Sequence, residues 1–168
     1  MMKKLCILLT FVLMCSFLCS CADKEVVKTN DIPAESKNQI DTISLTDVRE
    51  EILTELKIED SMPIETESLN SLYGIDSALV KQSASFVTMS GTFPHEVIMV
   101  EATDKEAVKT LEEALGKKLA EVMVQSKSYD AENYKLAQQC KVSVKGNFVT
   151  LFLSPDHAQI QTILDKYI

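Results

Sequence analysis

The sequence predicts an α+β domain in which an antiparallel β-sheet of about four strands, arranged as two hairpins, is covered by helices mainly on one face. The first hairpin spans 85–102, with a turn expected at 91–94. The second spans 141–153, where Gly146-Asn147 separates two segments that alternate between apolar and polar residues. Between and around the hairpins, apolar residues recur every three or four positions, which is the spacing of helices.

Helices are expected before, between and after the hairpins. The segment 45–56 carries an apolar stripe, and a short apolar turn at 69–73 ends at Gly74, a residue suited to a left-handed helix stop. The longest predicted helix, 103–127, opens with the capping box Thr103-Asp104-Lys105-Glu106. A short helix is predicted at 130–138, and Ser154-Pro155 is typical of the start of a last helix.

The second hairpin predicts which side chains share a face. A glycine-first two-residue loop favours a type II′ turn, which pairs Lys145 with Phe148 and Val142 with Leu151. Strand alternation then assigns one face to the core: Cys140, Val142, Val144, Val149, Leu151 and Leu153. The opposite face is a possible binding face, formed by Phe148, Phe152, Lys141, Lys145 and Thr150. The alternative is that helices cover both faces, or that the N-terminal tail packs there.

The N-terminal residues predict that the protein is exported and attached to a membrane. Lys3 and Lys4 precede an apolar run over 5–18 that is shorter than a bilayer-spanning helix. Leu18-Cys19-Ser20-Cys21 then resembles the lipobox of bacterial lipoproteins, in which the final cysteine is lipidated. The alternatives are an uncleaved membrane anchor, or cleavage at an earlier small residue that leaves Cys21 as a plain thiol.

This interpretation divides the chain into three parts. We expect a signal peptide at 1–20, a lipidated cysteine and flexible linker at 21–43, and a single domain at 44–168. The lipid on Cys21 would anchor the protein to the outer face of the cell membrane. Of the five cysteines, only Cys140 would then remain as a thiol, so the mature domain cannot form an intramolecular disulfide.

Composition and motifs limit the partners and the kinds of site that the chain can have. The formal net charge of −8 argues against nucleic acid as a partner. The two histidines, His95 and His157, have no zinc-ligand spacing, and no nucleophile-elbow motif is present. We therefore predict no metal site, no cofactor and no catalytic residue, and we expect Cys140 to pack as a small apolar side chain.

Several local motifs are similar to those of an uncharacterised lipoprotein family. They are Leu72-Tyr73-Gly74-Ile75-Asp76, the spaced pair Tyr129 and Tyr134, and Val144-Lys145-Gly146-Asn147-Phe148-Val149. The family comes from Gram-positive anaerobic Firmicutes and is catalogued as domain of unknown function 4358. The resemblance covers roughly 45–168 and implies a lipid-anchored envelope protein with no established catalytic residues.

Two hypotheses of function follow. The first is a non-enzymatic binding or accessory module of the cell envelope, whose partner is an envelope protein or a cell-wall polymer. The alternative is a small envelope hydrolase or acyl-transfer accessory enzyme that uses His95 or His157.

Overall fold

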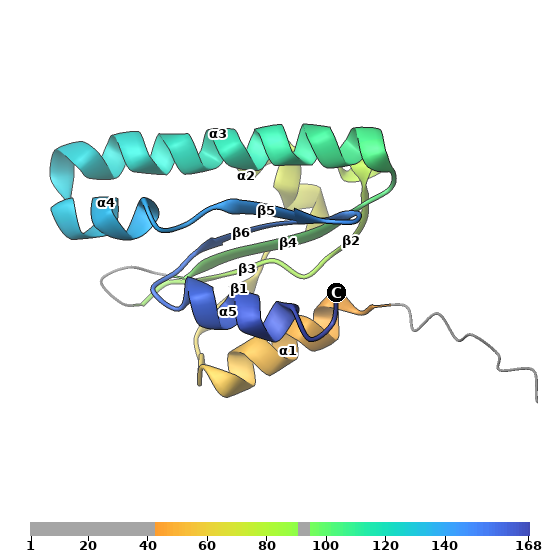
Figure 1. Cartoon of the computed structure of the whole chain (residues 1–168), viewed down its shortest axis with the longest axis horizontal. Coiled ribbons are helices and arrows are strands. Elements are labelled where there is room, and N and C mark those ends of the chain that lie inside the picture. Colours follow the sequence, from red (N-terminus) through yellow and green to blue (C-terminus); the bar gives the residue numbers. More distant parts are fainter. Residues whose placement is uncertain (1–42, 91–94) are drawn as a thin grey trace, which may run out of the picture. The chain divides into compact units, whose positions relative to one another are not determined.

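The computed structural model describes residues 43–90 and 95–168 (Figure 1). The α-helices are α1 (Leu45–Glu55), α2 (Leu69–Tyr73), α3 (Lys105–Tyr129), α4 (Ala131–Ala137) and α5 (His157–Leu164), and the 3₁₀ helices are η1 (Thr66–Ser68) and η2 (Ser77–Leu79). The strands are β1 (Ser61–Pro63), β2 (Val80–Ser83), β3 (Phe86–Thr88), β4 (Glu96–Ala102), β5 (Val142–Lys145) and β6 (Phe148–Leu153). The turn predicted at 91–94, the predicted signal peptide, Cys21 and nearly all of the predicted linker lie outside the described residues.

All strand pairs in the sheet are antiparallel, which confirms the predicted α+β class. Its order is β1-β3-β4-β6-β5, and β2 also pairs with β4. Strand β3 pairs with the beginning of β4, through Phe86 opposite Val97, and β2 pairs with its end, through Val80 opposite Ala102. The two short strands β2 and β3 therefore follow one another along the same side of β4. The prediction missed β1 and β2.

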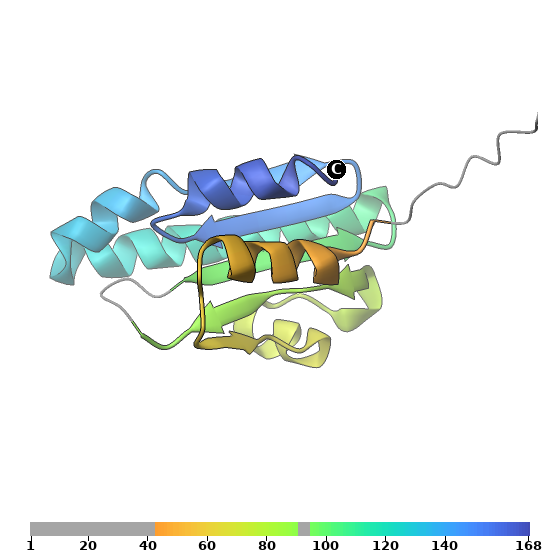
Figure 2. The same cartoon turned by 90° about the horizontal axis from the view of Figure 1, so that it is seen from below.

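Helices cover both faces of the sheet, with the longest helix and the larger share of the helical residues on one of them (Figures 1 and 2). Helices α2, α3 and α4 lie on one face, and α1 and α5 lie on the other. The reason is the central strand β4, which is apolar on both faces. Ile98 and Val100 pack in the core beneath α3, whereas Val97 and Met99 pack in a second core beneath α1 and α5.

The hairpin of β5 and β6 has the predicted register, with Lys145 opposite Phe148 and Val142 opposite Leu151. Gly146 has a φ of 60°, as a glycine-first turn requires. The predicted core face is confirmed, since five of its members pack in the core beneath α3: Cys140, Val142, Val149, Leu151 and Leu153. Val144 is the exception, because 42% of it is exposed near the end of the sheet's edge strand.

The long helix α3 begins one residue later than a cap at Thr103 would give. Asp104 is its N-cap, and the Asp104 carboxylate accepts hydrogen bonds from the backbone N–H groups of Glu106 and Ala107, both at 2.9 Å. The fully buried residues of α3 lie in its first half and end at Leu115. Its second half continues to α4, with which it packs to form one end of the domain (Figure 1).

The start of α1 is fastened to the sheet by one side chain, Gln82 on β2. Its Oε1 accepts a hydrogen bond from the Leu45 backbone N–H at 3.0 Å. Its Nε2 lies 2.8 Å from the Ile43 carbonyl and 2.6 Å from the Glu101 carboxylate. The chain therefore enters the domain beside the end of β4. Within the described residues, no helix is both long and apolar enough to cross a membrane.

Candidate functional site

The predicted binding face of the second hairpin is largely covered. Phe152 is 4% exposed and Thr150 is 2% exposed, and Phe148 packs against the same core beneath α1 and α5. Lys145 reaches over to α5, where its Nζ lies 3.7 Å from an Asp165 oxygen. Lys141 is exposed. This correction follows from the apolar residues of β4 and β6 on that face, which require a second helical layer.

A cavity of about 370 Å³ remains at the margin of that covered face. Lys141 and Phe152 line it together with His157 of α5. His157 Nδ1 lies 3.0 Å from the Ser154 carbonyl and must donate this hydrogen bond, because a carbonyl only accepts. His157 is thus held at the start of α5, as its position in the predicted last helix implied.

His95 lies on the same face of the sheet, next to a serine and an aspartate. His95 Nδ1 lies 2.7 Å from Ser154 Oγ, and His95 Nε2 lies 3.9 Å from Asp156 Oδ2. Ser154 Oγ also accepts a hydrogen bond from the Asp156 backbone N–H at 3.0 Å, in the turn before α5, whose N-cap is Asp156 and not Ser154 as the sequence predicts. Ser154 is 0% exposed, so its hydroxyl has no approach for a substrate. Within this group only the Ser154 hydroxyl is fully buried, since the side chains of His95 and Asp156 are 19% and 43% exposed.

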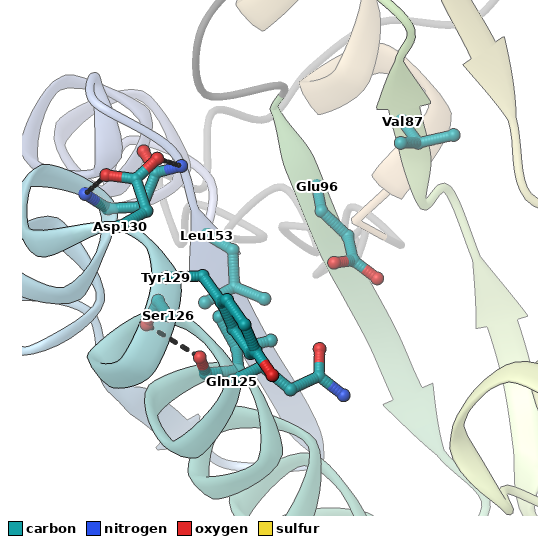
Figure 3. A pocket seen from close by; sticks show the side chains of 9 residues that line it. Val87, Glu96, Gln125, Ser126, Tyr129, Asp130 and Leu153 are labelled. Atoms are coloured by element: carbon teal, nitrogen blue, oxygen red, sulfur yellow. Dashed lines mark hydrogen bonds between the residues drawn. The ribbon is translucent and has the colours of Figure 1, made fainter.

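A second cavity of about 370 Å³ lies on the opposite face, between the end of α3 and the sheet (Figure 3). Its volume is in the range of small-molecule binding sites. Val87 of β3, Leu153 of β6 and Val122 of α3 supply its apolar surface. Its remaining lining residues are polar or aromatic: Glu96, Gln125, Ser126, Tyr129, Asp130 and Asn133.

Glu96, the first residue of β4, is held in this cavity by partners from two helices. The Tyr73 hydroxyl donates a hydrogen bond to Glu96 Oε1 at 2.8 Å, and Lys118 Nζ lies 3.0 Å from the same oxygen. The Lys118 ammonium also lies 5.4 Å from the centre of the Tyr73 ring, in cation–π range. Burial raises the pKa of Tyr73, and the charge of Glu96 and its hydrogen bond raise it further, so the phenol stays protonated.

The helical side of the cavity is built at the junction of α3 and α4. Asp130 caps α4 by accepting hydrogen bonds from the backbone N–H groups of Glu132 and Asn133, and Asn133 Nδ2 donates another to it at 2.7 Å. Tyr129, just before this cap, is 92% exposed. Figure 3 shows Glu96 coming from β4 on one side, and Gln125 and Tyr129 from α3 on the other.

This arrangement is suited to binding. The lining combines an apolar surface, an aromatic ring and amide groups, whereas none of its nine residues is a histidine or a cysteine. Across residues 43–90 and 95–168, no three side chains of His, Cys, Asp or Glu gather as a metal site would need. Cys140 is buried, and burial raises the pKa of its thiol.

Sequence reasoning did not find this cavity, apart from Tyr129. The sequence pattern places Glu96 at the start of a strand. It places Gln125 and Asn133 on the solvent-facing surface of helices. The available signal was the length of α3, which continues well beyond Leu115, the last of its buried residues. Tyr129, together with Tyr134, is one of the motifs that carry the family resemblance.

Comparison with known proteins gives one match. The family model described as "Domain of unknown function (DUF4358)" matches residues 54–154, which is more than half of the chain. No curated protein and no solved structure shows significant similarity to this chain. The matched range contains every residue that lines the cavity of Glu96 and Tyr129. The chain therefore belongs to the DUF4358 family.

Proposed function

We propose that the protein is a lipid-anchored, extracytoplasmic binding module of the cell envelope, and that its ligand occupies the cavity between α3, α4 and the sheet. We call this cavity the Glu96 cavity. The observation that carries the proposal is the composition of the Glu96 cavity, in which an exposed aromatic ring and amide side chains surround an apolar floor. In sites of this kind an apolar surface holds the ligand and a few polar groups fix its orientation.

The position of the Glu96 cavity supports a tethered role. The chain enters the domain at Ile43, whose carbonyl accepts a hydrogen bond from the Gln82 side chain. Gln82 pairs with Glu101, near the end of β4. The cavity lies at the beginning of β4, beside Glu96. From Glu96 to Glu101 the strand rises about 17 Å. The cavity and the site where the tether joins the domain are therefore at opposite ends of the sheet, which suits presentation of a ligand away from the membrane.

The proposed anchor is the lipid on Cys21. Acyl chains contribute ~0.8 kcal/mol per buried methylene, and two chains hold a protein firmly at a bilayer surface. The net charge of −8 gives the domain no attraction to anionic headgroups. The lipid alone would therefore bind the membrane, and the domain would remain available to a partner in the envelope.

The anchor is tested by labelling cells that express the full chain with an alkyne-tagged palmitate. The wild-type chain should carry the label and sediment with membranes. The Cys21→Ala variant should carry none and should leave the membrane fraction. Label that persists in this variant would contradict lipidation at Cys21.

The binding site is tested by photo-crosslinking from the membrane-anchored full chain. A benzophenone amino acid replaces Gln125, which lines the Glu96 cavity, or Glu113, an exposed residue nearer the start of α3 that serves as the matched control. We expect a discrete crosslinked product from position 125 and none from position 113. The same products from both positions, or none from position 125, would contradict a ligand in the Glu96 cavity.

A second candidate function is an envelope hydrolase or acyl-transfer accessory enzyme. One contact favours it, the 2.7 Å hydrogen bond between His95 and Ser154, because a serine hydroxyl bonded to an imidazole is the core of many acyl-transfer sites. The complete burial of Ser154 stands against it. The reactivity of Ser154 towards a serine-directed probe decides between the two functions.

A further inference from the structure

The charges around the Glu96 cavity restrict the ligand that it can take. Lys118 lies 3.0 Å from Glu96 Oε1 and neutralises its carboxylate. The Asp130 carboxylate accepts three hydrogen bonds at the start of α4, where a negative charge is favourable. Because each carboxylate already has a compensating partner, the cavity needs no cation from the ligand. An uncharged ligand fits it best.

The hydrogen-bonding groups of the Glu96 cavity define the ligand further. Both recorded partners of Glu96, the Tyr73 hydroxyl and the Lys118 ammonium, bind Oε1, so Oε2 can accept a hydrogen bond from an N–H or O–H group. Gln125 supplies an amide that can donate to a carbonyl, and Asn133 supplies a second. These groups lie next to the apolar side chains of Val87, Val122 and Leu153.

An acetamido group matches this set of contacts. Its N–H would donate to Glu96 Oε2, its carbonyl would accept from Gln125 or Asn133, and its methyl group would lie on the apolar floor. The Tyr129 ring, which is 92% exposed at the cavity, offers an apolar face against which a sugar ring can stack. A simple hexose would leave the apolar floor uncovered, and a deacetylated amino sugar would bring an unneeded positive charge.

We propose that the Glu96 cavity binds an uncharged N-acetylated amino sugar, as a free sugar or as a unit of a glycan. This inference rests on the proposed binding function and specifies its ligand class. Tyr129 stacks on the sugar ring, Glu96 accepts the acetamido N–H, and the floor of Val87, Val122 and Leu153 receives the methyl group.

The test is saturation-transfer difference NMR on the full, membrane-anchored chain with three trisaccharide probes. They are tri-N-acetylchitotriose, its deacetylated form chitotriose, and cellotriose, which has no nitrogen. We expect saturation to pass mainly to the acetyl methyl protons of the first probe, with a dissociation constant of about 1 mM or tighter. The other two probes should fail to displace it.

Two variants locate the binding. Tyr129→Ala should weaken binding by at least ~10-fold through loss of stacking, and its exposure makes the fold insensitive to the change. Gln125→Ala should weaken it as well, because one amide partner is lost. The matched control is Gln138→Ala, an exposed amide at the C-cap of α4 that does not line the cavity, and it should bind as the wild type does.

Three outcomes would overturn the sugar assignment. They are no saturation transfer to the acetylated probe, equal binding of the deacetylated probe, and unchanged binding in Tyr129→Ala. Its failure is distinguishable from failure of the binding function, since a crosslink from position 125 requires only a ligand close to that position, and Asn133 still supplies an amide when Gln125 is replaced. A peptide or lipid captured from position 125 but not from 113, with no binding of the acetylated probe, would overturn only the sugar. Absence of both signals would overturn both.

Discussion

The Tyr73 hydroxyl donates a hydrogen bond to Glu96 Oε1 at 2.8 Å, and so joins the end of α2 to the first residue of β4. Lys118 of α3 completes the contact at 3.0 Å from the same oxygen. One carboxylate thus connects a helix before the central strand, the strand itself and the long helix after it. Because Glu96 also lines the proposed binding cavity, this contact fixes the position of a carboxylate that the proposed ligand would meet.

Replacing Tyr73 by Phe should destabilise the domain. The substitution removes one hydrogen bond to a charged acceptor, which costs about 2 kcal/mol in the free energy of unfolding. Urea unfolding of the full chain measures the change. Tyr129→Phe is the matched control, because its ring is 92% exposed, and it should stay within about 0.5 kcal/mol of the wild type. Equal stabilities for Tyr73→Phe and Tyr129→Phe would contradict a stabilising role for the Tyr73 hydroxyl.

The sequence predicted most of the elements whose signal is local. The register of β5 and β6 follows from Gly146-Asn147 alone, and the left-handed stop at Gly74 follows from its place after an apolar turn. The short strands β1 and β2 were missed because a run of three or four residues has too little periodicity to be recognised. They exist because β3 and β4 supply hydrogen-bonding partners for them.

The arrangement of helices on the two faces and the Glu96 cavity could not be predicted from local sequence patterns. Whether helices cover one face or two depends on β4, whose run from Val97 to Val100 is apolar on both sides. Such a run indicates a strand buried on both faces, which the hairpin pattern by itself does not predict. The Glu96 cavity joins residues that are up to 66 positions apart, from Val87 to Leu153, and no spacing in the sequence connects them.

Two glycines should respond in opposite directions when changed to Ala. Gly74 has a φ of 71° at the C-cap of α2, and Ala in this left-handed conformation costs about 1 kcal/mol. Gly116 lies inside α3, where Ala is a better helix former by up to about 1 kcal/mol. An added Cβ meets no atom within 4 Å at either position, so conformation alone decides the sign. Thermal unfolding of both variants tests this, and destabilisation by Gly116→Ala would contradict it.

Ser154 should be unreactive towards a fluorophosphonate probe. The residue is 0% exposed, and its hydroxyl is occupied by His95 and by the Asp156 backbone N–H. Intact-protein mass spectrometry of the full chain should therefore show no added phosphonate. Ser154→Ala should cost about 1 kcal/mol of stability through loss of the hydrogen bonds that its hydroxyl makes with His95 and the Asp156 backbone. A stoichiometric adduct on Ser154 that disappears in His95→Ala would instead favour the hydrolase function.

The contact between α1 and the C-terminus should make stability depend on pH. Hydrogen bonds from Lys166 and then from Tyr167 lower the pKa of Glu51 from its usual 4.5, and the bond to Glu51 raises the pKa of Lys166 above 10.5. A carboxylate whose pKa is lower in the folded state stabilises that state above its unfolded pKa, and this contribution is lost as the pH falls below 4.5. The contribution of Lys166 is present below 10.5 and is lost as the pH rises further.

Glu51→Gln should therefore be less stable than the wild type at neutral pH, and the difference should shrink as the pH falls below 4.5 and Glu51 takes up a proton. Urea unfolding at a series of pH values measures it. The matched control is Glu112→Gln, an exposed carboxylate on α3, which should follow the wild-type profile throughout. A difference between wild type and Glu51→Gln that stays constant from neutral to acid pH would show that the ionised carboxylate of Glu51 does not fasten the C-terminus to α1.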